Sequence, residues 1–193
     1  ANLFWRSFSH WIGGMGVLVF ILAILPMSGG STMNLMKAES PGPSVGKLVP
    51  RIQQTAFLLY AIYFAMTIIE LILLLCGSMR PFDALCLTLG TAGTGGFGIR
   101  NDSLASYSTY SQIVVTVFMF LFGVNFTFYY FILINKVKDA LHMEEVRGYF
   151  ILFAAASVAI AVNLCLTGTP GFWHNLQQSA FQVASVMTTT GYA

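Results

Sequence analysis

The sequence predicts an all-α integral membrane protein made of repeated helix–loop–helix units, and three observations support this fold class. Hydrophobic residues make up 56% of the 193-residue chain and charged residues only 8%, whereas an ordinary soluble domain is about one-quarter charged. Several apolar runs approach the ~20 residues needed to cross a bilayer. One order of elements occurs twice: a long apolar run, a glycine break, a short apolar run and a Thr/Gly loop.

Four segments, taken in chain order, are apolar enough to be membrane spans. They cover residues 11–26, 56–76, 113–134 and 150–166. An amphipathic stretch, residues 4–10, precedes the first span. Pro26 ends the first run and Gly77 follows the second, as expected where helices stop.

Two further segments, residues 82–89 and 173–187, are apolar but too short or too polar to cross a membrane. Each follows a span and a Gly/Pro break, and each leads into a loop rich in glycine and threonine. Their length and position predict short helices that enter the membrane and turn back.

The distribution of basic residues predicts the orientation of the chain. Six of the nine Lys and Arg residues fall in the linkers 27–55 and 135–149. Because short cytoplasmic loops carry an excess of Lys and Arg, both linkers are predicted to be cytoplasmic, with the Thr/Gly loops on the outer side.

The internal repeat predicts the organisation of the chain. Residues 94–98 align with residues 189–193 at an offset of 95 (191 minus 96). We expect the second helix of unit one (1–26), a cytoplasmic linker (27–55), a complete helix–pore-loop–helix unit two (56–134), a second cytoplasmic linker (135–149), and the first helix, pore helix and filter of unit three (150–193). The chain starts without Met and lacks a signal peptide, so we expect a fragment of a longer protein.

The Thr/Gly loops are the candidate functional site. Residues 189–193 read Thr-Thr-Gly-Tyr-Ala, similar to the Thr-Val-Gly-Tyr-Gly loop whose carbonyl oxygens replace the hydration shell of potassium. Such a backbone needs positive φ angles, which glycine adopts freely. Each loop also follows the C-terminal end of a short helix, where the helix dipole favours a cation. The predicted ion-binding residues are Thr94, Gly95, Gly96, Thr189, Thr190 and Gly191.

Alternative interpretations of these loops remain open. Residues 93–98 match Gly-x-Gly-x-x-Gly, but a dinucleotide site requires a preceding strand and a helix directly after the loop. Here a predicted helix precedes the motif and a polar stretch, residues 100–111, follows it. A packing turn in a structural membrane subunit without conduction, or a pore for sodium or mixed cations, would also accommodate the loops.

Composition excludes several other classes of function. The net charge of +2 is too small to predict a nucleic-acid partner. Cys76, Cys86 and Cys165 form no Cys-x-x-Cys pair, so we expect neither a disulfide framework nor a metal centre. Ser157 and Cys165 have no histidine at a useful spacing for nucleophilic catalysis, so we expect no enzyme and no cofactor.

The residues as a whole resemble the Trk/Ktr potassium-transporter superfamily, in its TrkH-like branch. Residues 5–16 (Trp-Arg-Ser-Phe-Ser-His-Trp-Ile-Gly-Gly-Met-Gly) are similar to the family signature after its first filter. Residues 92–97 and 179–192 resemble the second and third filter regions. The resemblance implies four units around one pore, K⁺ as the transported ion and a bacterial inner (plasma) membrane location. It also implies contact with membrane lipid, a homodimer, and a cytosolic nucleotide-binding regulatory subunit.

Four polar residues have competing interpretations. Glu70, inside the second span, is either a cation attractor in the outer vestibule or a carboxylate hydrogen-bonded to a pore helix, and we favour the second. Asp83 is expected to complement a helix N-terminus. Asp102 either adds negative potential at the pore mouth or is a solvated loop residue. Asn125 either lines the pore or bonds a neighbouring helix, and we favour the second because interhelical bonding is the commoner use.

Overall fold

The computed structural model describes residues 2–14, 16, 49–133, 135, 137–168 and 171–193, and no strand occurs within these ranges. This confirms the all-α fold class. The helices are α1 (Asn2–Gly14), α4 (Val49–Cys76), α5 (Pro81–Ala92), α6 (Thr109–Phe122), α7 (Phe126–Leu133), α8 (Val137–Leu141), α9 (Glu144–Leu166) and α10 (Phe172–Met187).

Two helices are long and apolar enough to cross a membrane, namely Ala56–Cys76 within α4, and α9. The helices themselves start earlier than the predicted spans at residues 56 and 150, since α4 begins at Val49 and α9 begins at Glu144. The acidic first turn of α9 complements the positive end of its helix dipole. Most of the predicted first span, and the linker up to residue 48, lie outside the described residues.

The predicted third span is bent rather than straight. Its two parts, α6 and α7, meet at an angle of 85°. Gly123 ends α6, and the Asn125 side-chain oxygen accepts a hydrogen bond from the Thr127 backbone N–H at 2.9 Å, which caps the start of α7. A Cβ at Gly123 would lie 2.5 Å from the Tyr149 hydroxyl and 2.6 Å from Thr188 Cγ2, so neighbouring side chains also occupy the inside of the bend.

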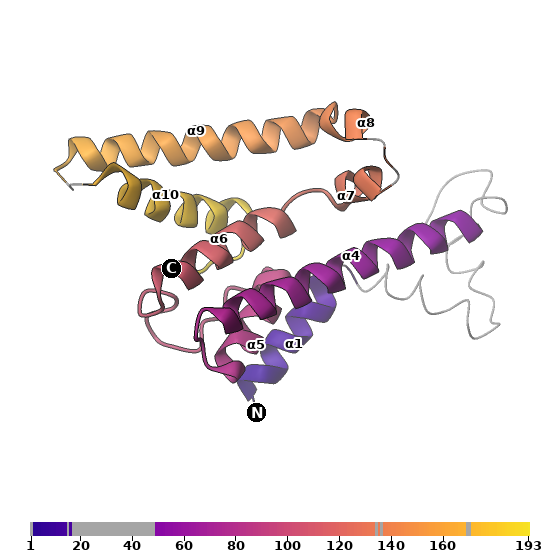
Figure 1. Cartoon of the computed structure of the whole chain (residues 1–193), viewed down its shortest axis with the longest axis horizontal. Helices are drawn as coiled ribbons and strands as arrows, with labels where there is room; N and C mark the ends of the chain where they lie inside the picture. Colours follow the sequence, from indigo (N-terminus) through magenta and orange to yellow (C-terminus); the bar gives the residue numbers. More distant parts are fainter. Residues whose placement is uncertain (1, 15, 17–48, 134, 136, 169–170) are drawn as a thin grey trace.

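The two short apolar segments form short helices, as predicted. Pro81 occupies the first turn of α5, where its missing N–H costs no hydrogen bond. Gly171, with a φ of 106°, precedes α10 and turns the chain back along α9. Figure 1 shows α9 and α10 as an antiparallel pair, with α6 between this pair and the group formed by α1, α4 and α5.

The buried core lies where these two groups of helices meet. It contains Tyr63 of α4, Leu87 of α5, Met119 of α6, Phe181 of α10 and Tyr192 of the final loop. Outward-facing positions on the two long helices carry large apolar side chains, including Phe57, Ile72, Ile151 and Leu152. Exposed apolar surface of this extent on a spanning helix is suited to contact with lipid.

Candidate functional site

The structure brings the two predicted Thr/Gly loops into direct contact. A Cβ added to Gly96 would overlap the carbonyl oxygen of Thr190, and would lie 3.0 Å from the carbonyl carbon of Gly191. Residues about 95 positions apart in the sequence therefore form one site. Only glycine at position 96 allows the backbones of the two loops to approach so closely.

The two loops also share one backbone conformation. Positive φ angles occur at Thr94 (50°) and Gly96 (61°) in one loop, and at the equivalent Thr189 (56°) and Gly191 (86°) in the other. Alternation between left- and right-handed backbone turns successive carbonyl groups toward the same side, as a carbonyl-lined ion site requires. A β-branched threonine rarely adopts positive φ, so both threonines are held in strained conformations of the kind that cluster at functional sites.

The short helices aim their C-terminal ends at these loops. Gly93 follows the last residue of α5, and Thr188 follows the last residue of α10. The negative end of each helix dipole, about half an elementary charge, therefore lies beside a loop. This electrostatic arrangement favours a cation at the loops and disfavours an anion.

The loop after α10 is anchored by hydrogen bonds to its own helix and to the segment that follows the other loop. Ser185 Oγ of α10 donates to the Tyr192 carbonyl oxygen at 2.6 Å, and the hydroxyls of Thr188 and Thr190 lie 2.7 Å apart. The Ala193 N–H donates to Ser103 Oγ at 3.2 Å, across to the segment that follows the other loop. The Thr190 side chain is thus buried and paired, while its carbonyl oxygen faces Gly96.

Helix α1 supports the other loop from a third direction. The His10 imidazole stacks on Phe97 with ring centroids 4.9 Å apart, and a Cβ at Gly95 would lie 3.0 Å from its Cγ. The Arg6 guanidinium carbon lies 4.3 Å from the Phe97 ring centroid, and Arg6 Nη2 donates to the Gly98 carbonyl oxygen at 3.5 Å. The sequence analysis placed Arg6 and His10 in the segment that resembles the family signature but assigned neither a contact with this loop, because only the fold brings α1 to it.

Acidic residues take separate positions around the site. Glu70 is fully buried, so the vestibule interpretation is wrong for the structure described here. Asp83 lies in the first turn of α5, as expected, and accepts a hydrogen bond from the Tyr107 hydroxyl at 3.1 Å. Burial, together with the Asp83 charge, raises the pKa of Tyr107. Asp102 is exposed in the segment that follows the Thr/Gly loop after α5.

Asn125 makes the interhelical contact that was expected of it. Its amide nitrogen donates to Glu145 Oε2 of α9 at 3.1 Å, beside a cavity of about 190 Å³ at the bend. Among the described residues, no group of three or more His, Cys, Asp or Glu side chains could hold a metal ion. The loop carbonyl groups are therefore the candidate cation ligands that the described part of the chain offers.

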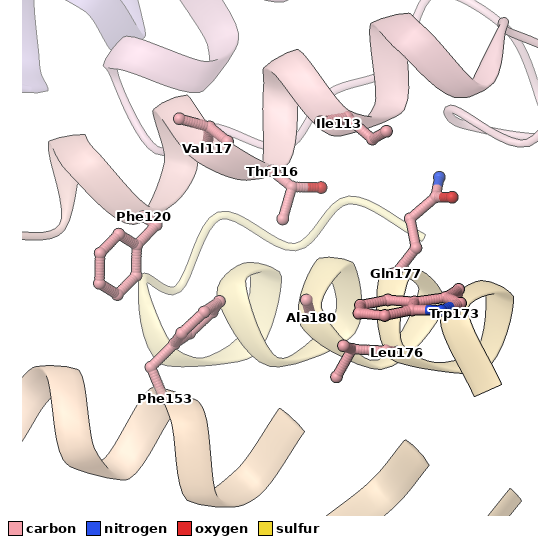
Figure 2. A pocket seen from close by; sticks show the side chains of 9 residues that line it. All are labelled: Ile113, Thr116, Val117, Phe120, Phe153, Trp173, Leu176, Gln177 and Ala180. Atoms are coloured by element: carbon pink, nitrogen blue, oxygen red, sulfur yellow. The ribbon is translucent and has the colours of Figure 1, made fainter. Parts of the chain in front are cut away.

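A larger groove of about 510 Å³ lies away from the loops, between α6, α9 and α10. Figure 2 shows Phe120 and Phe153 at one end and Trp173 with Gln177 at the other. Its lining is almost entirely apolar, and it carries no charged side chain. The groove therefore has no chemistry for binding or conducting an ion.

Comparisons with known proteins show which family the whole chain resembles. The family described as TrkH, cation transport protein, matches residues 1–193. The Trk system potassium uptake protein TrkH of Vibrio parahaemolyticus is 31% identical over 198 residues, which cover 100% of this chain and 41% of that relative. TrkH of Escherichia coli is 31% identical over 204 residues, with coverage of 100% and 41%.

The fold of this chain is also similar to that of a solved structure. The crystal structure of the potassium transporter TrkH from Vibrio parahaemolyticus matches with a TM-score of 0.77 at 27% identity. The match covers 100% of this chain and 39% of that chain. The chain thus spans about two-fifths of the length of the relatives it matches, in agreement with the expectation of a fragment.

Proposed function

This chain belongs to the TrkH family of cation transport proteins, and from that premise we propose that it forms part of a pore for potassium uptake. Its relatives carry the names of transporters, which confirms the expectation that the chain is not an enzyme. Family membership together with the two apolar helices confirms a multi-pass membrane protein. Because the chain spans only part of its relatives, potassium transport is a proposal for the longer protein.

The observation that carries this proposal is the pairing of the two loops. Both have positive φ at equivalent threonine and glycine positions, both follow a helix C-terminus, and they touch at Gly96 and Thr190. A dehydrated cation would bind to the carbonyl groups of Thr94, Gly95, Gly96, Thr189, Thr190 and Gly191. The helix dipoles and the carbonyl dipoles would replace part of its hydration shell, with no covalent step.

The proposed architecture follows the internal repeat. Residues 56–134 form one complete helix–pore-loop–helix unit, residues 1–26 complete the preceding unit, and residues 150–193 begin the next. The remaining carbonyl ligands would come from two further filter loops in the longer protein. A homodimer, surrounding lipid, a bacterial inner membrane and a cytosolic nucleotide-binding regulatory subunit belong to the same proposal.

The test is potassium uptake by the full-length protein in cells that lack their own uptake systems. Gly96→Ser and Gly191→Ser place a side chain at positive φ within the loops, whereas Gly148→Ser places one in open space on α9. We expect the parent and Gly148→Ser forms to restore growth at low potassium. Both loop variants are expected to lose uptake or to admit sodium.

Protein levels in the membrane are measured for every form, so that failure to insert is not mistaken for failure to conduct. Uptake that is indifferent to both loop substitutions would contradict the filter assignment. Equal uptake of sodium and potassium by the parent would favour a mixed-cation pore.

A further inference from the structure

The two Thr/Gly loops carry an aromatic residue at equivalent positions, and the structure holds the two rings in different ways. Phe97 follows Gly96, and Tyr192 follows Gly191. Tyr192 is 1% exposed, and its hydroxyl donates to the Leu87 carbonyl oxygen of α5 at 3.2 Å. Phe97 is 38% exposed and has no hydroxyl group. The loop after α5 therefore cannot be anchored by the hydrogen bond that anchors the loop after α10.

Helix α1 supplies the contacts that hold the Phe97 ring. Arg6 and His10 are four residues apart and so share one face of α1, and Figure 1 shows α1 beside α5. The Arg6 guanidinium carbon lies 4.3 Å from the centroid of the Phe97 ring, and the His10 ring centroid lies 4.9 Å from it. A guanidinium over an aromatic ring at this distance makes a cation–π interaction. An aromatic ring of the candidate site is thus held by two side chains from a helix distant in the sequence.

Arg6 also reaches the backbone of the same loop. Its Nη2 donates to the Gly98 carbonyl oxygen at 3.5 Å, a long hydrogen bond that the positive charge strengthens. Its Nε is buried and has no hydrogen-bond partner among the described residues. Part of the guanidinium is therefore removed from water, unlike that of a solvated surface arginine, and its contacts with the loop offset this loss of hydration.

The helix that carries Arg6 is packed closely against the end of α5. A Cβ on Gly93 would lie 2.5 Å from the carbonyl carbon and oxygen of His10, and a Cβ on Gly95 would lie 3.0 Å from His10 Cγ. At the other end of α1, a Cβ on Gly14 would lie 2.9 Å from the Gly93 Cα. Such close contact leaves α1 little freedom to shift against the loop, so α1 is a fixed support for the Arg6 side chain.

We propose that Arg6 is a positioning residue of the candidate site, which holds Phe97 and the Gly98 carbonyl group and thereby keeps the loop after α5 in its ion-binding conformation. Phe97 and Gly98 directly follow Gly96, so a displaced ring moves the backbone that carries the Gly96 carbonyl group. Arg6 acts through the loop, because a guanidinium has no lone pair to offer a cation. Its effect on selectivity rests on the proposed function of the loops, whereas its effect on loop conformation does not.

The first test is hydrogen–deuterium exchange of the full-length protein in lipid. The backbone N–H groups of Thr94 and Gly95 donate hydrogen bonds within this loop, so their exchange reports its opening. Arg6→Met keeps a long side chain without charge or donors, and should speed exchange in residues 94–98 about fivefold, as for one lost cation–π contact. Exchange in residues 189–193 should not change. Unchanged exchange in the first range, or an equal increase in both ranges, would overturn the proposal.

The second test compares potassium and sodium uptake by proteoliposomes. Arg6→Met and Phe97→Leu should each lower the ratio of potassium to sodium uptake about fivefold, because each removes the cation–π contact. The double variant should lose no more than Arg6→Met alone, since the two changes remove a shared contact. Phe97→Tyr keeps the face of the ring and should keep the ratio of the parent.

Arg100 provides the matched control. Its guanidinium carbon lies 4.5 Å from the Tyr107 ring centroid, and its Nη1 donates to Ser106 Oγ at 2.7 Å, so it makes the same kinds of contact outside the loop. Arg100→Met removes the same charge and should leave the uptake ratio unchanged. A loss equal to that of Arg6→Met would indicate an effect of charge alone and would overturn the proposal.

Two other results would also overturn it, namely additive losses in the double variant, or a loss in Phe97→Tyr as large as that in Phe97→Leu. If the parent transports no potassium, the proposed function fails. The exchange measurement then still decides whether Arg6 positions the loop.

Discussion

The contact between the two loops predicts that their glycines differ in how they tolerate a methyl group. Both Gly96 and Gly191 have positive φ, so alanine at either position carries the left-handed backbone penalty of about 1–2 kcal/mol. A Cβ at Gly191 meets no described atom within 4 Å. A Cβ at Gly96, in contrast, overlaps the Thr190 carbonyl group.

The size of the required shift follows from the geometry. The carbonyl carbon of Thr190 would lie 2.7 Å from the new Cβ, whereas ordinary contact begins at 3.4 Å. The loops must therefore separate by at least 0.7 Å at this point, the difference between these two distances. Binding sites lose function when their groups move by more than about 0.5 Å. We expect Gly191→Ala to lower potassium uptake about tenfold, from backbone strain alone.

Gly96→Ala should lower uptake by at least a further tenfold, because steric overlap adds to the same strain. The assay is the initial rate of potassium or rubidium uptake in proteoliposomes that contain equal amounts of each variant. Gly148→Ala provides the control, since this glycine lies in α9 with open space around it. The reasoning is refuted if Gly96→Ala is as active as Gly191→Ala.

Two further predictions concern the elements around the site. Asn125→Ala removes the cap of α7 and the hydrogen bond to Glu145, so it should destabilise the protein by about 1 kcal/mol. Thermal unfolding in detergent measures this loss, and an unchanged melting temperature would contradict the role of Asn125. The pKa of Tyr107 is higher in the folded protein than in the unfolded chain, where it is about 10. The hydrogen bond from Tyr107 to Asp83 should therefore stabilise the fold fully at pH values below about 10. This stabilisation should be lost as the pH rises through the pKa of Tyr107 in the folded protein. Tyr107→Phe should therefore lower the melting temperature at pH 7, and should lower it less at strongly alkaline pH. A difference between the two forms that does not depend on pH would contradict this assignment.

The local features of this protein could be read from its sequence, because they depend on residues close together in the chain. The apolar runs predicted α4 and α9, since a bilayer requires about 20 apolar residues whatever their neighbours are. The Thr/Gly pattern predicted positive φ at Gly96 and Gly191, because the steric freedom of glycine is a property of the residue itself. The repeat predicted that both loops would follow short helices.

Features that depend on contacts between distant segments could not be read in this way. No pattern in the sequence shows that Gly96 touches Thr190, that His10 and Arg6 support Phe97, or that Tyr192 packs against the neighbouring pore helix. The bend at Asn125 was also missed, because hydropathy alone does not distinguish a straight span from a broken one.

Glu70 illustrates the difference between what the sequence shows and what only the tertiary structure shows. Its sequence position established that a carboxyl group occurs inside an apolar helix, and that this is costly unless the group faces protein or water. Only the tertiary structure decided which face of α4 carries it, and that this face is fully buried among the helices. The sequence alone thus determined the membrane class, the two long apolar helices and the positive φ of the loop glycines, through local sterics and hydropathy. Packing between helices decided which loops meet and which buried groups support them, because those interactions join residues that the chain itself keeps far apart.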